Sequence, residues 1–503
     1  MSGQRDARRD LLRLVALTVI TRLPAILFFH PIDDESIYAV AGNAIVAGGR
    51  PYLDAIERKP PLLFWTYAAI VRITGEYNWV ALHVVSTLWV LATLAGLYVL
   101  ARRLFDHDAG VVAALMYTVF QPWGFWKNLA FNGEVLMNLP IVWGWAIALG
   151  PPLTRRRFEL TASGALLGAA CLLKQPAAIA AVPLGLLVFH RRYRDAQGYS
   201  AADATLQAGL FTAGFSAPIA AAALVLARQG VLQEGIYWTI TNHAATLVFW
   251  NRGVENTLAF GAACLPVLVA AALSLRDSRR WSLRAAERWA LLAWLTASAV
   301  GAAAGGRFYP HYYIQLLPPL AVLAAPELAR LWFQQRGTSL VWSRRGTQAW
   351  IALSACVFLA VNSAGLWLRR GEAPEVTYVR EHSQPGDRIF VWGQSTNFYL
   401  EARRTPASRY IATFPLTGYI FGPRIEIDTN DRIVPGAWDN LEHDLDAHRP
   451  AFIVDTEAGP AARYPLERFL PMARRVASQY ELVSHSASTR IYRRLPPVPA
   501  DEE

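Results

Sequence analysis

Long apolar runs recur through most of this chain, and no other feature of the sequence constrains its fold as strongly. A helix that crosses a membrane needs about 20 mostly apolar residues. With 54% apolar and only 17% charged residues, the chain is also too apolar for an ordinary soluble enzyme. We therefore predict a mainly α-helical polytopic membrane protein with about eleven spans. The expected spans are Leu11–Phe29, Trp79–Leu100, Gly110–Trp126, Val135–Ala148, Leu160–Leu173, Pro176–Phe189, Ala204–Ala227, Leu258–Leu275, Trp289–Ala304, Tyr313–Leu331 and Ala349–Leu368.

Arginine clusters in alternate connections between these runs. The arginine-rich set comprises the N-terminal tail, Arg102-Arg103, Arg155-Arg156-Arg157, Arg191-Arg192, and the segments 276–288 and 330–345. Cytoplasmic loops carry an excess of Lys and Arg, so we predict that this set and the N-terminus are cytoplasmic. The other loops would face outward, which in a bacterial inner membrane is the periplasm. The net charge of +10 is thus a topology signal and gives no evidence of nucleic-acid binding.

The sequence changes character after Arg370. We predict a membrane domain over residues 1–370 and a small external α/β domain over residues 371–503. The expected strands are Arg388–Trp392, Ala451–Asp455, Tyr480–Ser484 and Thr489–Arg493, and the expected helices are Pro374–His382, Thr396–Arg403, Ala437–Ala447 and Leu466–Ser478.

The stretch Phe29–Trp65 holds the most concentrated charge beside a span. Asp33, Asp34 and Glu35 stand together and are followed by a segment of helical periodicity, which Gly48-Gly49 ends. Lys59 comes next, and Pro60-Pro61 begins a second apolar piece, Leu62–Ile73, which is too short for a span and predicts a second in-plane helix. One interpretation is an acidic turn that caps a helix lying at the membrane surface. The other is a polar site, with Asp34 as its base and Glu35 orienting the loop or binding substrate.

Other external loops add candidates for the same site. Glu134 opens a span, where a carboxylate is either a helix N-terminal charge or a second acid of the site. Lys174 interrupts an apolar hairpin, so it snorkels to the interface or faces a polar cavity. The loop 305–315 places Arg307, His311 and Tyr312 at the mouth of a span, with chemistry that suits a phosphate. His311 could bind a metal, but it is the only histidine in this loop, and a single histidine is more often a hydrogen-bonding residue.

Lysine is rare in this protein. Only Lys59, Lys127 and Lys174 occur among 48 Lys and Arg residues, and all three fall in predicted external loops. A lysine ammonium is a compact point charge that binds phosphate where the wide arginine fork does not fit. We predict that Lys59, with Arg307 and Lys174, neutralises a lipid phosphate, and that Lys127 lies at the interface.

These motifs together resemble the membrane glycosyltransferases of the GT-C fold, in the protein-mannosyltransferase and aminoarabinose-transferase group. The resemblance rests on the order Asp34-Glu35, Gly48-Gly49-Arg50-Pro51-Tyr52, Lys59-Pro60-Pro61 and the late Arg307 to Tyr313 loop. It implies that Asp34 is the essential first-loop acid and that Lys59 and Glu134 line the donor site. The chain departs from the aminoarabinose branch at Arg58, where that branch has Glu before Lys-Pro.

The resemblance implies an inverting transfer of a sugar from a polyprenyl-phosphate donor to a hydroxyl of a cell-envelope acceptor. No nucleotide or flavin cofactor is implied, and a divalent metal stays an open question, since Asp34, Glu35 and Glu134 could hold one. Two other classes remain. A transporter or flippase would favour charged helices near the bilayer midplane and paired repeats, and a structural membrane subunit would leave the acids without a role.

Overall fold

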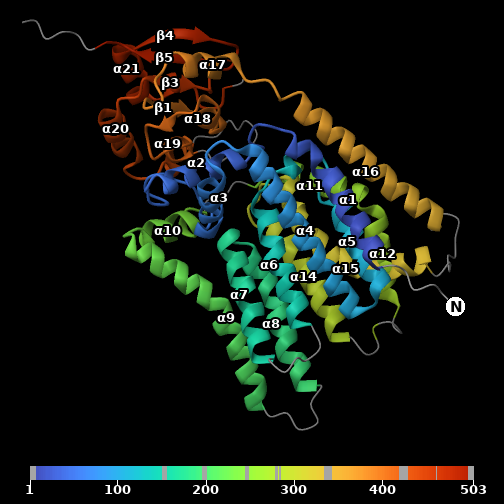
Figure 1. Cartoon of the computed structure of the whole chain (residues 1–503). Helices are drawn as coiled ribbons and strands as arrows, with labels where there is room; N and C mark the ends of the chain where they lie inside the picture. Colours follow the sequence, from blue (N-terminus) through green and yellow to red (C-terminus); the bar gives the residue numbers. More distant parts are fainter. Residues whose placement is uncertain are drawn as a thin grey trace, which may run out of the picture.

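The computed structural model describes residues 7–149, 156–194, 201–243, 248–277, 281, 285–333, 343–418, 429–459 and 462–496. A bundle of helices makes up most of it, and a small mixed sheet with its own helices covers one end of that bundle (Figure 1). The predicted mainly helical fold with a small C-terminal sheet is thus confirmed.

The bundle contains the helices of the first 367 residues. They are α1 (Ala7–Ile26), α2 (Glu35–Val46), α3 (Pro61–Thr74), α4 (Trp79–Leu104), α5 (His107–Phe120), η1 (Trp126–Leu129), α6 (Gly133–Ala148), α7 (Arg156–Leu173), α8 (Ala177–Arg194), α9 (Ala201–Arg228), α10 (Leu232–Thr239), η2 (Thr241–His243), α11 (Trp250–Ala263), α12 (Leu265–Arg276), α14 (Ala285–Ala303), η3 (Pro310–Leu316), α15 (Leu317–Phe333) and α16 (Arg344–Trp367).

Four helical segments among the described residues are long and apolar enough to cross a membrane, or five if the bent pair α11–α12 is one span. They are Trp79–Leu104, Ala202–Arg228, Pro310–Phe333 and Arg344–Trp367. Shorter apolar helices lie between them, so the predicted number of eleven spans is not confirmed. Large apolar side chains are exposed along α9 and α16, among them Leu224, Leu353 and Val361. Such surfaces suit a lipid environment, as expected of a multi-pass membrane protein.

Small residues and one buried arginine hold the bundle together. A Cβ at Gly164 or Gly214 would collide with a backbone carbonyl of the other helix, so these glycines let α7 and α9 approach closely. The Arg22 guanidinium is buried and donates to Gln121 Oε1 (3.2 Å), Ser86 Oγ (2.5 Å) and the Leu129 carbonyl (2.9 Å). It thereby joins α1 to α4, α5 and η1.

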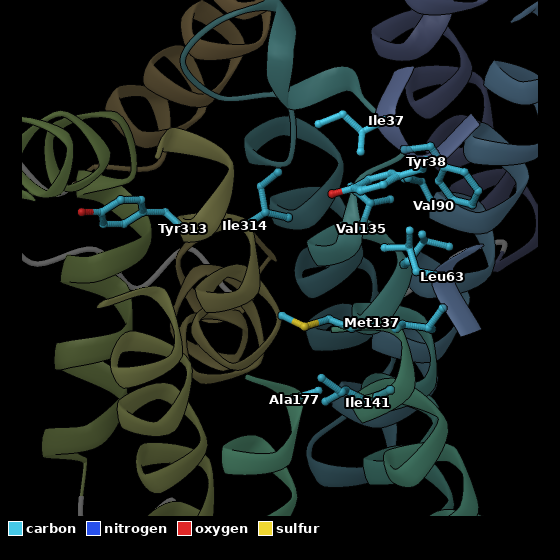
Figure 2. Packing of buried hydrophobic residues seen from close by; sticks show 14 of the residues in the cluster. Ile37, Tyr38, Leu63, Val90, Val135, Met137, Ile141, Ala177, Tyr313 and Ile314 are labelled. Carbon is cyan, nitrogen blue, oxygen red and sulfur yellow. The ribbon is translucent and has the colours of Figure 1, made fainter. Parts of the chain in front are cut away.

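Helices α2 and α3 form the predicted pair after the first run, and they shape one side of the site. The first eight residues of α2 are all buried, so this half is not the amphipathic surface helix that the sequence suggested. It packs on α3 on one side and on α18 (Asn397–Ala402) of the C-terminal part on another. Figure 2 shows Tyr38 of α2, Leu63 of α3, Val90 of α4 and Val135 of α6 gathered in one part of the buried core.

The C-terminal part contains a five-stranded sheet in the order β2-β1-β3-β5-β4. Strands β1 (Arg388–Trp392), β2 (Thr405–Pro406) and β3 (Phe452–Asp455) are parallel, while β5 (Arg490–Arg494) runs antiparallel to β3 and to β4 (Tyr480–His485). The register pairs Phe390 with Ile453 and Val454 with Ile491. The helices are α17 (Pro374–Glu381), α18 (Asn397–Ala402), α19 (Phe414–Thr417), η4 (Asn430–Arg432), α20 (Ala437–His448), η5 (Leu466–Arg468) and α21 (Leu470–Gln479).

The sheet domain is bonded to the loops at the end of the bundle (Figure 1). The Ser36 and Thr396 hydroxyl oxygens are 2.8 Å apart, and the Ile56 amide donates to the Arg409 carbonyl at 2.9 Å. These contacts fix the loop after β1 above the start of α2, and the main cavity of the protein lies beside them.

Candidate functional site

A polar cavity of about 750 Å³ lies between the bundle and the sheet domain. Loops and helix ends at the end of the bundle supply most of its wall. The rest comes from the connection after α16, from the loop after β1 with α18, and from Arg463. It brings together five of the predicted site residues, Asp34, Lys59, Arg307, His311 and Tyr312. These residues come from three segments far apart in the sequence, so their convergence depends on the fold.

Asp34 occupies the N-cap position of α2, but its side chain makes no capping hydrogen bond. Its carboxylate instead accepts from the Tyr38 hydroxyl at 3.1 Å, one helical turn later, and lines the cavity. The neighbouring Asp33 has a left-handed backbone with φ of 52°, a conformation that Asp tolerates better than most residues. This turn directs two adjacent carboxylates to the cavity wall.

The two aspartates have different electrostatic environments. Burial alone would raise the pKa of Asp34, but His311, Lys59, Lys174 and the Tyr38 hydroxyl together hold it below its ordinary value. Burial and then the Asp34 carboxylate raise the pKa of Asp33, although Lys127 and His311 oppose that shift. Lys127 Nζ lies 2.5 Å from Asp33 Oδ1. Asp34 is therefore the more acidic of the two carboxylates, and Asp33 is engaged in an ion pair with Lys127.

Cations and aromatic rings form the wall beside Asp34. Tyr309 and His311 stack with ring centroids 5.6 Å apart, and the Arg252 guanidinium lies over the Tyr309 ring at 4.8 Å. The Arg307 guanidinium lies 5.1 Å from the centre of the Phe249 ring. Phe308, which stands between Arg307 and Tyr309 in the sequence, has a backbone φ of 50°. This conformation is unusual for a bulky residue, and such conformations concentrate at functional sites. The rings thus hold these cations in the cavity wall.

Glu35 does not line the cavity. It is fully buried, and both carboxylate oxygens are occupied. Oε1 accepts from the Phe131 amide (2.6 Å), while Oε2 accepts from the Ile32 amide (2.7 Å) and lies 3.0 Å from His83 Nε2. Of the two roles predicted for Glu35, this geometry matches orienting the loop, because it ties the turn before Asp34 to α4 and to the segment before α6.

Glu134 and Lys174 also lie behind the cavity wall. They form a buried ion pair, and neither lines the cavity. The Lys174 ammonium sits 4.4 Å from the centre of the Tyr312 ring, so the pair supports a residue that does line it. Both residues were expected to contact the donor; the structure places them one layer further in, where the Lys174 charge acts on Asp34.

Several cavity residues were missed by the sequence predictions. Glu57 lines the cavity with its Oε1 3.6 Å from Lys59 Nζ, and Arg58 lies over the Phe414 ring at 5.1 Å. The sequence could have identified Glu57 and Arg58, because they form one charged run with Lys59. In the structure all three residues line the same cavity. Gln394, Ser395, Thr396, Asn397 and Glu401 of the sheet domain line the far wall and had no signal of their own.

Metal binding finds little support in this arrangement. Within the described ranges, no group of three or more His, Cys, Asp or Glu side chains is placed to hold a metal ion. Glu35 is committed to two backbone amides and His83, which separates it from Asp34 and Glu134.

Comparison with solved structures defines the class of fold. ArnT from Cupriavidus metallidurans bound to undecaprenyl phosphate superimposes with a TM-score of 0.60 at 16% identity, over 96% of this chain and 97% of that chain. The Archaeoglobus fulgidus oligosaccharyltransferase tethered with an acceptor peptide gives 0.54 at 16% identity, over 99% of this chain and 75% of that chain. The protein thus has the GT-C glycosyltransferase fold, as the sequence motifs predicted.

A sequence match narrows the resemblance within that fold. Residues 58–206 match the family described as dolichyl-phosphate-mannose-protein mannosyltransferase. The matched region begins at Arg58, beside Lys59, and includes Glu134 and Lys174. No curated protein sequence matches the chain.

Proposed function

We propose that this protein is an inverting glycosyltransferase that moves a sugar from a polyprenyl-phosphate donor to a hydroxyl of a cell-envelope acceptor on the external face of the membrane. The observation that carries the proposal is the single cavity in which an ionised carboxylate, Asp34, faces Lys59, His311 and Arg307. An ArnT of this fold binds undecaprenyl phosphate, which supports a lipid-phosphate donor.

The proposed reaction is a displacement at the anomeric carbon of the donor sugar. Asp34 accepts the proton of the acceptor hydroxyl while the oxygen of that hydroxyl forms the new glycosidic bond. The bond between the anomeric carbon and the phosphate oxygen breaks, and its electron pair leaves with the polyprenyl phosphate. Lys59 and Arg307 offset the charge that develops on that phosphate. Attack from the face opposite the phosphate inverts the configuration.

A cavity built from loop residues and the sheet domain supports a transferase over a transporter. A transporter site would lie near the bilayer midplane between broken helices. The charged groups here gather instead at the end of the bundle, and the buried Arg22 is bonded to neutral groups that join helices.

The test is a transfer assay with the full-length protein in liposomes and a panel of radiolabelled polyprenyl-phosphate sugars. We expect one donor to give labelled product and free polyprenyl phosphate in equal amounts, in the wild type and not in Asp34→Asn. Movement of an intact donor across the bilayer without release of polyprenyl phosphate would refute the proposal and favour a flippase.

A further inference from the structure

A second, apolar cavity opens between helices α1 and α16. It measures about 590 Å³ and is lined by Ile20, Leu23, Leu27 and Phe29 on one side and by Leu359 and Trp367 on the other. Leu27, Phe29 and Trp367 are each more than 60% exposed. Figure 1 shows α16 running beside α1 along one side of the bundle. A groove of this composition suits a hydrocarbon chain.

The apolar groove joins the polar cavity. Phe28 and His30 line both, and the chain passes from His30 to Asp34 in four residues. At the junction, His30 Nδ1 lies 3.6 Å from Glu401 Oε1, and His30 Nε2 lies 3.1 Å from the Arg370 carbonyl oxygen. A molecule with a chain in the groove would therefore place its polar head beside Asp34.

The polar groups at this junction suit a hydroxyl-bearing head. Glu401, Ser395, Thr396 and Asn397 offer carboxylate, hydroxyl and amide groups that bind hydroxyls. The Gln394 Oε1 atom is buried without a hydrogen-bond partner and lines the same wall. Lys59 and Arg307, the cations assigned to the donor phosphate, come from other segments. Arg369 and Arg370 lie at the junction itself, where each guanidinium lies over a tryptophan ring and donates to a carbonyl of α16 at 2.9 Å.

We infer that the acceptor is a membrane lipid whose hydrocarbon chain lies in the α1–α16 groove and whose hydroxyl-bearing head enters the polar cavity past Phe28 and His30. The inference rests on the proposed function and names its acceptor class. Displacement with inversion brings the acceptor to Asp34 from the side away from the phosphate, and the groove gives a lipid that approach directly from the bilayer. An acceptor that is a soluble protein or glycan would have no use for this groove.

The experiment fills the groove without touching Asp34 or Lys59. Leu23→Trp and Ser363→Trp each place an indole in the groove from one of its two helices. Leu12→Trp is the matched control, because Leu12 lies on the same helix, is 58% exposed and does not line the groove. Transfer is measured with labelled donor against two acceptor pools from the producing cells: an organic lipid extract and the delipidated protein and glycan fraction.

We expect label in the lipid extract only, and a rise of at least tenfold in the KM for that extract in both groove variants. Leu12→Trp should behave as the wild type, and all variants should bind polyprenyl phosphate equally. Weaker polyprenyl-phosphate binding by the groove variants would overturn the inference and assign the groove to the donor chain. Label in the protein and glycan fraction would overturn it as well.

A second measurement separates this inference from the proposed function. Benzoylphenylalanine at position 363 is irradiated with the lipid extract, and the captured lipid is identified by mass spectrometry. Capture of a hydroxyl-bearing lipid that polyprenyl phosphate does not displace supports the groove assignment, whether or not a donor is turned over. A failure to turn over any donor would count against the proposed transferase function and not against the groove assignment. Capture of polyprenyl phosphate, or of no lipid, would refute the groove assignment.

Discussion

Two layers of ionisable side chains lie at the end of the helix bundle, one lining the polar cavity and one directly behind it. Asp34 and Lys59 belong to the first layer, where they are only partly buried and meet open space. Glu35 and the pair Glu134–Lys174 belong to the second, where they are almost fully buried and bonded to each other or to backbone amides. Residues of the same chemical type thus line open space in one layer and set geometry in the other.

The difference teaches that neighbours in sequence can have opposite roles. Asp34 and Glu35 are adjacent, yet only Asp34 reaches the cavity, because Glu35 turns inward to accept three hydrogen bonds. A change in the first layer should therefore reduce turnover and leave the fold intact. A change in the second should reduce stability first.

Asp34→Asn should give the largest effect. It keeps the size of the side chain and removes its basicity, so kcat should fall about 10²–10⁴-fold, while the KM for the donor and the thermal unfolding midpoint stay close to wild type. Turnover is measured in the liposome assay. Asp54→Asn is the matched control, because Asp54 lies in the connection between α2 and α3, is exposed and does not line the cavity. Near-normal turnover by Asp34→Asn would transfer the role of base to Asp33.

Lys174→Met tests the second layer. It leaves the Glu134 carboxylate buried without its partner, and breaking a buried ion pair in this way costs about 3–5 kcal/mol in the free energy of unfolding. The double variant Glu134→Gln/Lys174→Met removes both charges and should recover most of that loss. Denaturation in mixed detergent micelles measures both. A stable Lys174→Met protein that no longer binds the donor would place Lys174 in the first layer.

Lys59→Ala should act on donor binding. Hydrogen bonds to charged groups contribute about 1.5–3 kcal/mol, so the Kd for polyprenyl phosphate should rise about 10–150-fold. Arg276→Ala is the control, because Arg276 is an exposed cation of a predicted cytoplasmic loop. If both variants bind polyprenyl phosphate as the wild type does, the rare lysines carry no phosphate-binding role.

The sequence predicted elements better than it predicted layers. Helix α3 and strands β1 and β3 fall within a residue of their expected bounds, because apolar periodicity and Pro60-Pro61 mark them clearly. Asp34, Lys59 and the loop of Arg307 were identified because charges at the ends of apolar runs are conspicuous.

The sequence does not indicate which side chains turn inward or which distant segments come into contact. Nothing local distinguishes Glu35 from Asp34, since the turn that separates them depends on the Phe131 amide, almost a hundred residues away. The contribution of the sheet domain was unpredictable for the same reason. Gln394 and Thr396 are ordinary loop residues until the fold places them opposite Asp34.

The pH dependence of kcat/KM should show the smallest effect, and it compares two lysines within the first layer. The pKa of Asp34 is held below its ordinary value, so the basic form persists and the acid limb of the profile should lie below about pH 4 in the wild type. Lys59→Met removes one of the charges that lower this pKa. The pKa should then rise, and activity should fall at a higher pH than in the wild type.

Lys127→Met is the control for that shift, because Lys127 is paired with Asp33 at 2.5 Å and is not among the groups that lower the pKa of Asp34. Profiles are recorded between about pH 2.5 and 7.5, a range that extends below the ordinary pKa of Asp. Liposomes with saturating acceptor and low donor are used, so that kcat/KM for the donor is followed. The acid limb should move in Lys59→Met alone. A limb that moves equally in both variants would mean that the two aspartates titrate as one unit, and the assignment of Asp34 as the sole base would be wrong.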